Sequence, residues 1–516
     1  MPQEIELKLT VDPRHVRRLR DSLILRAPSL KHTARRRLVS TYYDTPSFSL
    51  LQNGAVLRVR KVGRERMQSV KMNAADGGGL ARRTELESVI RSDRPDLMQI
   101  ADPDVRWLIQ ECCADNDLVP IFLTDVMRET WLLQLGRSRI ECAIDRGIIA
   151  ADGRKAPICE VELELKSGQP MRLFQLAHRL NTVVPLRIEA ASKAARGYHL
   201  AKNAEFIAPT AAPVHVHAAM NVKDTFAAIA RTCVAHVLAS ADYAYKSETS
   251  EGIHEFRVSI RRMRAAFSIF RDAMPENCRF RIGNELRVLQ RKLSMAREWD
   301  VLVEETVASM PSRLRRHRSS QKLVKIAQTK CAEGHRSAHA TLQDTHYTDL
   351  LLRLASWNES QFASGTAPTR ERKWKTDVLA GPAPRFASEV MGTYHDKVRK
   401  LGEKIRKLDP MELHRLRIRV KKLRYATEFF GSLWPGRRLK RYLSALKDLQ
   451  QVLGALHDVT VAQKLIANLK TSGGGDAKSA TAPVEHWLVD CRRSSRKEAI
   501  ELWGRFAKQK LFWKNT

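Results

Sequence analysis

Residues 4–9 alternate strictly between charged and aliphatic side chains, reading Glu-Ile-Glu-Leu-Lys-Leu. In a β-strand this period of two places Glu4, Glu6 and Lys8 on one face and the aliphatic residues on the other. The charged face can be the solvated side of an edge strand, or it can line an interior that holds a charged ligand. One strand does not distinguish these two arrangements.

The same alternation recurs over the first 200 residues. Arg58 and Arg60 alternate with Leu57 and Val59 after the turn signal Asn53-Gly54. Further charged positions on strand-like segments are Lys71, Arg83, Glu85, Glu87, Arg128, Glu141, Asp145, Glu160, Glu162, Glu164, Lys166 and Arg187. We therefore predict an antiparallel β-barrel with a polar lumen, covered outside by helices. Arg83, Glu85 and Glu87 fit either lumen residues or a salt-bridged brace.

A lumen of this kind is expected to need a ligand, because like charges repel in a space of low dielectric. Cations in the lumen suit phosphate groups, and carboxylates suit hard divalent metals. The net charge of +33 over 516 residues also indicates a polyanionic partner. Most of this excess follows residue 200, since residues 1–200 hold 33 basic and 25 acidic residues.

Other features exclude several classes of protein. No apolar run reaches the roughly 18 residues of a membrane span, and the charged N-terminus is unlike a signal peptide. The eight cysteines are scattered without a Cys-x-x-Cys pair, which predicts reduced thiols, a cytoplasmic location and no zinc or iron–sulfur site. An aromatic content of 6% argues against a stacking platform for single-stranded nucleic acid. The oligomeric state stays open.

The periodicity changes after an Ala- and Pro-containing stretch, residues 203–217. We predict a β domain over 1–202, a linker over 203–217 and a helical domain over 218–510. A break at 364–384 divides the helical domain into halves of about 218–363 and 385–510, and a second break is predicted at 471–483. An internal repeat relates the halves, because residues 254–264 match residues 414–424 at an offset of 160.

Each copy of this repeat carries a cationic stripe at helical spacing beside an apolar one. The stripe residues are His254, Arg257, Arg261, Arg262, Arg264, His414, Arg417, Lys421, Lys422 and Arg424. Two such helices can line a basic groove for a linear polyanion; the alternatives are a solvated basic face and metal ligation by His254 and His414. Arg297 and Asp300, three residues apart, are expected to form an intrahelical ion pair.

Five motifs in the first domain resemble the CYTH, or triphosphate tunnel metalloenzyme, family. These are Glu4-x-Glu6-x-Lys8, Tyr42-Tyr43-Asp44-Thr45-Pro46, Gly54-x-x-Leu57-Arg58-x-Arg60, Glu160-x-Glu162-x-Glu164 and Ser192-Lys193. The duplicated stripe resembles the CHAD domain, a module of two four-helix halves. The CYTH resemblance implies a triphosphatase acting on inorganic triphosphate, and the CHAD resemblance implies binding of inorganic polyphosphate. Alternatives are a protein that binds polyphosphate without catalysis, a thiamine triphosphatase and an adenylyl cyclase.

The CYTH resemblance also implies roles for individual residues. Catalysis would depend on Glu4, Glu6, Lys8, Arg58 and Arg60. The triphosphate would be held by Lys8, Arg58, Arg60, Lys71, Arg128, Arg187 and Lys193. A Mg²⁺ or Mn²⁺ ion would be bound by Glu4, Glu6, Glu162 and Glu164, with Asp145 and Glu160 as less certain ligands.

Overall fold

The structure is a computed structural model that describes residues 3–26, 31–73, 79–114, 116–247, 249–271, 276–362, 376–472 and 474–514. Contacts within the chain divide it into two compact units. The first comprises residues 1–209, 238–247 and 342–363; the second comprises residues 210–237, 248–341 and 364–516. Helix α6 (Val222–Lys246) begins in the second unit and ends in the first.

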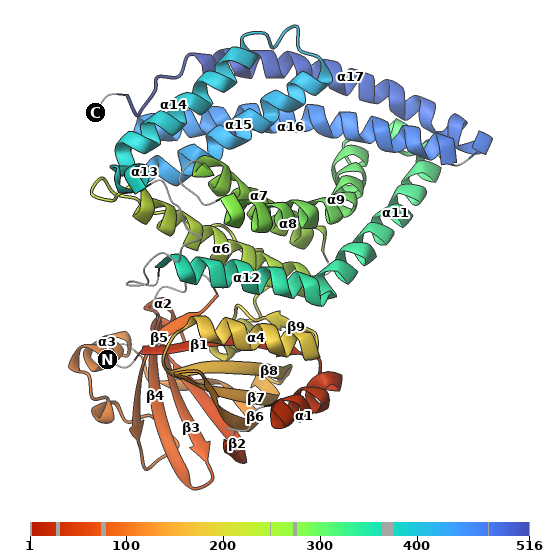
Figure 1. The fold of residues 1–516 in the computed structure, drawn as a ribbon. Helices are drawn as coiled ribbons and strands as arrows, with labels where there is room; N and C mark the ends of the chain where they lie inside the picture. The colour runs from red at the N-terminus through yellow and green to blue at the C-terminus, as the bar shows by residue number, and fades with distance from the viewer. Residues whose placement is uncertain are drawn as a thin grey trace. The chain divides into compact units, whose positions relative to one another are not determined.

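The first unit is built around nine antiparallel strands (Figure 1). The strands are β1 (Gln3–Val11), β2 (Lys31–Asp44), β3 (Ala55–Val62), β4 (Glu65–Asn73), β5 (Ala81–Val89), β6 (Val119–Leu135), β7 (Ser138–Ala151), β8 (Arg154–Ser167) and β9 (Leu186–Ile188). They follow the order β5-β4-β3-β2-β6-β7-β8-β1-β9, and pairing of β5 with β1 closes the first eight into a barrel. The predicted antiparallel barrel is confirmed.

Helices cover the barrel, as the aliphatic outer faces of its strands require. The helices of this unit are α1 (Val16–Arg26), α2 (Ser49–Gln52), α3 (Pro103–Cys112), α4 (Met171–Val183), α5 (Lys193–Ala201) and α12 (Thr345–Phe362). Val105 and Ile109 of α3, for example, pack against Leu57 and Val59 of β3. α12 packs on α4 and β9, and Asn181 Nδ2 donates to the carbonyl of Thr345 at 2.9 Å.

The barrel interior is apolar at one end, although the sequence predicts a polar lumen. Tyr42 stacks on Phe122 with ring centroids 4.3 Å apart, and Tyr198 of α5 meets Phe122 edge to face at 5.1 Å. Phe122 has the same strand parity as Arg128, so it points inward like the charged residues. Gly197 lets α5 approach this closely, because a Cβ there would lie 2.0 Å from the Phe122 ring. Helix α5 therefore closes one end of the lumen with an aromatic cluster.

The second unit is helical (Figure 1). Its elements are α7 (Ser250–Ile269), α8 (Glu276–Lys292), α9 (Ser294–Asp300), a π-helix (Val301–Val307), α10 (Ser312–Arg315), α11 (Arg318–Gln343), α13 (Thr376–Ala380), α14 (Ala383–Gly402), α15 (Pro410–Phe430), α16 (Arg437–Ser472) and α17 (Gly474–Ala507). α16 packs along α15 on one side and along α17 on the other. The predicted helical C-terminal region is confirmed.

The predicted break at 471–483 is wrong in extent, because α16 runs to Ser472 and α17 starts at Gly474. Pro483 lies inside α17. The next residue, Val484, and Leu488 are fully buried against Ala462 and Ile466 of α16, so tertiary packing compensates for the hydrogen bond that proline removes. Much of the other predicted break, residues 363–375, lies outside the described residues.

Across the described ranges, no helix has the length and apolar character needed to cross a bilayer.

Candidate functional site

The barrel holds a cavity of about 270 Å³. Of the tunnel residues predicted from the sequence, its lining includes Glu4, Glu6, Lys8, Arg58, Arg60, Lys71, Arg128, Asp145, Glu162, Glu164 and Lys193. Strand pairing brings residues that are distant in the sequence together, so that Lys8 of β1 stands directly opposite Glu162 of β8. These side chains face one shared interior.

Arg187 does not line this cavity, contrary to the role that the resemblance implies. Its guanidinium carbon lies 3.6 Å from the centroid of the Tyr245 ring, which is a stacked cation–π contact. Arg187 lies on β9, which pairs with only the last three residues of β1, beyond the segment of β1 that closes the barrel on β5. Its strand position therefore places it beyond the part of the barrel that encloses the cavity.

Five charged residues outside the predicted set also line the cavity: Arg83, Glu85, Glu87, Glu141 and Lys166. The first three, which the sequence leaves between lumen and brace, are lumen residues. Lys166 continues the alternation of Glu160, Glu162 and Glu164 along β8. Glu141 has the same parity as Asp145 on β7, so the same period-two pattern contained the evidence for both Lys166 and Glu141.

The lumen is electrically balanced, because eight lysines and arginines line it together with eight carboxylates. The opposite charges therefore offset the like-charge repulsion on which the expectation of a ligand rests. Most of the charges pair across the strands. Lys71 Nζ, for example, lies 2.6 Å from Glu4 Oε2 and 3.0 Å from Glu85 Oε2.

Glu162 is the centre of one such network. It accepts hydrogen bonds from Arg128 Nη2 and from Lys193 Nζ, the latter at 2.8 Å. Arg128 also forms a two-pronged pair with Asp145 at 2.6 and 2.7 Å. Burial opposes the charged form of Glu162, but the charges of Lys193 and Arg128 outweigh it and hold the pKa of Glu162 well below its usual range. Glu162 is therefore ionised at neutral pH.

A second network joins β1, β3, β4 and β5. Arg58 donates to Ser69 Oγ at 2.7 Å and to Glu85 Oε1 at 2.8 Å. Burial opposes ionisation of Glu85, yet Arg58 and Lys71 lower the pKa of Glu85 to about 2. Glu4 differs, because burial raises its pKa despite the nearby charge of Lys71. Lys71 therefore bridges two carboxyl groups whose pKa values are shifted in opposite directions, Glu85 downward and Glu4 upward.

Arg60 has no such partner. Among the described residues no carboxylate forms an ion pair with it, and its one side-chain hydrogen bond is a long one, 3.3 Å to Ser40 Oγ. Burial, together with the like charges of Arg58 and Arg128, lowers the pKa of Arg60 to about 10. Arg60 is therefore an uncompensated cation directed into the cavity.

The cavity offers suitable donors for a hard divalent cation. Asp145 and Glu162 of the cavity lining and Glu160, which is buried and does not line it, each contribute a carboxylate oxygen, and these oxygens lie within 4.8 Å of one another. Mg²⁺ and Mn²⁺ prefer such oxygen ligands, so the donor set fits the expected metal. Glu160 is held by Lys193 and by Arg196, the latter at 2.5 Å. Within the described parts of the chain, the other predicted ligands line the same cavity without joining this cluster: Glu4, Glu6 and Glu164.

The second unit contains a larger cavity of about 790 Å³. Of the predicted stripe residues, its lining includes His254, Arg257, Arg261, Arg264, His414, Arg417, Lys421, Lys422 and Arg424. Arg297 and His457, outside the predicted stripes, join them. Arg264 donates to Gln290 Oε1 at 2.6 Å and Arg424 donates to Gln450 Oε1 at 2.8 Å. An amide side chain thus holds each guanidinium group, and Arg424 also pairs with Glu428 at 2.6 Å.

Arg262 is the exception among the stripe residues. It is buried at 8% exposure, and its guanidinium carbon lies 5.1 Å from the centroid of the Phe429 ring. Because Arg262 directly follows Arg261 on α7, the helical rotation of about 100° per residue turns it from the cavity into the core.

This second cavity is strongly cationic, since eight lysines and arginines line it against two carboxylates, Glu298 and Asp458. Burial, followed by the charges of Arg417 and Arg261, lowers the pKa of Lys421 to about 6. His414 and His457 also lie in the cavity, with their Nδ1 atoms 3.1 Å apart. Burial lowers the pKa of His457 to about 3, and Arg417 adds to the effect. The crowded cations therefore disfavour one another's protonated forms, and a bound anion would stabilise those forms.

Two family models match successive parts of the chain. The CYTH domain family model matches residues 2–198, and the CHAD domain family model matches residues 228–467. An inorganic triphosphatase of Haemophilus influenzae is 36% identical over 202 residues. That match covers 39% of this chain and 55% of the relative, so the chain spans about half the length of the curated relative it matches.

Two solved structures are similar to the chain. The CHAD domain from the plant Ricinus communis superposes with a TM-score of 0.51 at 23% identity, covering 59% of this chain and 98% of its own. PptA from Streptomyces chartreusis gives a TM-score of 0.44 at 13% identity, covering 55% of this chain and 99% of its own. The Ricinus match supports the helical fold. The chain therefore carries a CYTH domain followed by a CHAD domain.

Proposed function

We propose that the barrel hydrolyses inorganic triphosphate to diphosphate and phosphate with the help of Mg²⁺ or Mn²⁺. The observation that carries this proposal is the cavity in which cations and carboxylates alternate within one closed lumen. The named activity of the Haemophilus influenzae relative supports it. A triphosphate is a short, highly charged chain, and a lumen of about 270 Å³ is suited to such a ligand rather than to a large one.

In this proposal the lumen exchanges partners when substrate enters. The cations Arg58, Lys71, Arg128 and Lys193 now neutralise carboxylates. With a triphosphate bound, they turn to its oxygens, where planar guanidinium groups form paired hydrogen bonds. The carboxylates released in this way gain a positive partner again when a divalent cation binds. Substrate and metal thus replace charge pairs already present, and the buried charges stay compensated throughout.

Each group has a distinct role in the proposed reaction. When bound, the divalent cation would neutralise phosphate oxygens and lower the pKa of a bound water. Arg58, Arg60 and Lys8 hold positive charge at fixed positions, where it stabilises the charge spread over the equatorial oxygens of the transferred phosphoryl group. Asp145, Glu160 and Glu162 form the metal-binding group, with Glu4, Glu6 and Glu164 as further acidic donors. No covalent nucleophile is required.

The test is phosphate release from inorganic triphosphate, thiamine triphosphate and ATP by the full chain, with Mg²⁺ or Mn²⁺ present. We expect inorganic triphosphate to be cleaved fastest, and Glu4→Gln and Arg58→Ala to abolish release while circular dichroism stays unchanged. Arg146→Ala is the matched control, because Arg146 is an exposed arginine on β7. No phosphate release from any substrate would favour a non-catalytic binding protein, and formation of cyclic AMP from ATP would favour a cyclase.

We further propose that the cavity of the second unit binds inorganic polyphosphate. The excess of eight cations over two carboxylates supports a linear polyanion as its ligand. The paired contacts of Arg264 with Gln290 and of Arg424 with Gln450, each 26 residues apart, support equivalent roles for the two stripes. The duplication itself and its four-helix halves remain predictions.

Charge reversal tests this second proposal. The quadruple variant Arg257→Glu, Arg261→Glu, Arg417→Glu and Lys421→Glu should lose polyphosphate binding and keep nearly all triphosphatase activity. A control with the same change in net charge reverses four exposed arginines of the same unit: Arg313, Arg315, Arg316 and Arg318. Equal polyphosphate affinity in the cavity variant and in its control would end the proposal.

A further inference from the structure

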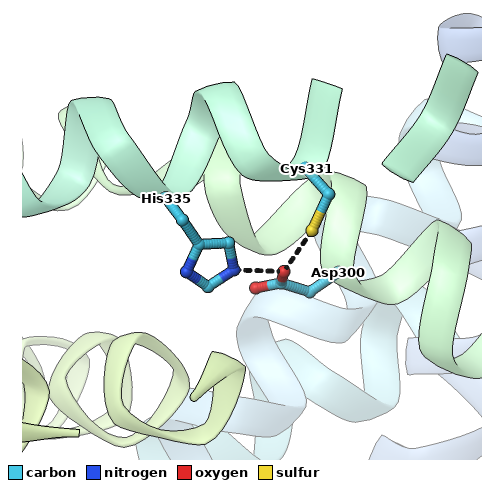
Figure 2. Close-up of side chains that lie close together, drawn as sticks. All are labelled: Asp300, Cys331 and His335. Atoms are coloured by element: carbon cyan, nitrogen blue, oxygen red, sulfur yellow. Dashed lines mark hydrogen bonds and ion pairs between the residues drawn. The ribbon is translucent and has the colours of Figure 1, made fainter. Parts of the chain in front are cut away.

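A compact group of three different donor side chains lies in the second unit (Figure 2), and none of the three lines the cationic cavity. Asp300 is the last residue of α9, and Cys331 and His335 lie one turn apart on α11. Figure 2 shows the thiol and the imidazole pointing at the same carboxylate. A sulfur, a nitrogen and an oxygen atom therefore meet within 4.8 Å of one another.

Both contacts of Asp300 within this group fall on one of its two carboxylate oxygens. Cys331 Sγ lies 3.0 Å and His335 Nε2 lies 2.6 Å from the same oxygen, Oδ1. The second oxygen, Oδ2, is buried and has no hydrogen-bond partner among the described residues. Asp300 itself is 0% exposed. A buried carboxylate oxygen without a partner is costly, so its presence calls for an explanation.

The ion pair that the sequence predicts for Asp300 does not form. Arg297 instead pairs at 2.5 Å with Glu305 of the π-helix Val301–Val307, which directly follows Asp300. π-helical turns are uncommon and often occur at functional sites. Asp300 is instead in contact with Cys331 and His335 of α11.

We propose that Asp300, Cys331 and His335 bind a divalent transition metal of the zinc class. Zinc takes thiolate, imidazole and carboxylate ligands, and three protein ligands leave one tetrahedral position for water. Cys331 and His335 have the i, i+4 spacing that places two ligands on one helical face. Zn–S and Zn–N distances of about 2.3 and 2.0 Å put the donor atoms of a tetrahedral site about 3.5 Å apart, so the present contacts would have to widen by about 0.5–1 Å. The unpartnered Oδ2 supplies a free coordinating atom.

The mixed donor set separates this site from the tunnel. The tunnel group consists of carboxylates alone, which suit Mg²⁺ and Mn²⁺, whereas a thiolate selects softer metals. Access is available, since His335 retains 25% side-chain exposure. The cysteine spacing in the sequence does not predict this site, because its ligands come from two helices and only one of them is a cysteine.

Cobalt provides a direct test, since a thiolate ligand gives Co²⁺ a sulfur-to-metal charge-transfer band in the near ultraviolet. The full chain is reduced, stripped of metal with a chelator and titrated with Co²⁺. We expect the band to saturate at one equivalent and to disappear when Zn²⁺ is added in excess. Metal bound in the tunnel does not contribute, because its oxygen ligands give no such band.

Variants assign the band to the proposed residues. Cys331→Ser should remove it, and His335→Gln should weaken cobalt affinity by more than about tenfold, the loss typical even of an outer-sphere partner. Cys491→Ser is the matched control, because Cys491 is another partly buried free cysteine of the same unit. The charge-transfer band of the Cys491→Ser variant should be the same as that of the wild type. Absence of the band in the reduced wild-type chain, or its persistence in Cys331→Ser, would overturn the proposal and leave a hydrogen-bonded ion pair that braces the π-helix.

Discussion

Arg60 provides the sharpest test of the electrostatic balance in the tunnel. It is the lumen cation whose charge no described carboxylate neutralises, and burial lowers its pKa to about 10. Arginine ordinarily titrates above about 12, and each tenfold change in an equilibrium constant is worth about 1.4 kcal/mol. The charged form of Arg60 therefore costs the ligand-free fold about 3 kcal/mol at most.

We accordingly expect Arg60→Met to stabilise the barrel while it impairs catalysis. Methionine preserves much of the side-chain volume and removes the charge; after the loss of the weak Ser40 contact, we expect a net gain of about 1–2 kcal/mol. Loss of a preorganised cation should lower kcat/KM for triphosphate by a factor of about 10²–10³. Opposite signs for stability and activity are typical of a residue retained for function.

Arg58→Met is the matched comparison. Arg58 is also a lumen arginine, but it is paired with Glu85 and Ser69, so its removal leaves a buried carboxylate without its partner. Both variants should lose activity, whereas only Arg58→Met should lose stability. Hydrogen exchange of the β3 and β6 amides reports on the barrel separately from the helical unit. The reasoning would be refuted if Arg60→Met accelerated hydrogen exchange of these amides as much as Arg58→Met does.

Three further predictions follow from named contacts. Glu162→Gln should abolish triphosphate hydrolysis and destabilise the barrel by about 2 kcal/mol, since it removes charge-assisted bonds from Arg128 and Lys193; unchanged hydrogen exchange would count against this network. Gly147→Ala should cost about 1–3 kcal/mol, because a Cβ there would lie 2.0 Å from the Asp125 carbonyl oxygen of β6; calorimetry measures the loss, and a neutral result would show that β6 can move. The pKa of Lys421 is lowered to about 6 in the ligand-free cavity, and a bound polyanion would raise it. Polyphosphate affinity should therefore increase as the pH falls from 8 towards 6, and Lys421→Gln should flatten that dependence in equilibrium titrations.

The strands and the faces they present were predictable because both depend on local periodicity. The alternation in residues 4–9 and along β8 identified the inward-facing charges directly, and helical spacing did the same for Arg257 and Arg261. Arg187 and Arg262 lie outside the two cavity linings, because sequence position does not reveal where a strand joins the sheet or how far a helix face is covered. Pro483 reads as a helix end in the sequence, yet packing on α16 carries the helix through it.

The sequence by itself determined which residues are charged, which lie on the same face of a strand or helix, and that two kinds of domain follow one another. Only the tertiary structure decided how those charges are compensated: equal numbers of opposite sign in the barrel, and a large excess of cations in the helical cavity. The same holds for the solitary Arg60 and for the meeting of Asp300 with a helix about 30 residues further on. Coulomb energy and desolvation depend on distances across the fold, and those distances are set by strand register, barrel closure and helix packing.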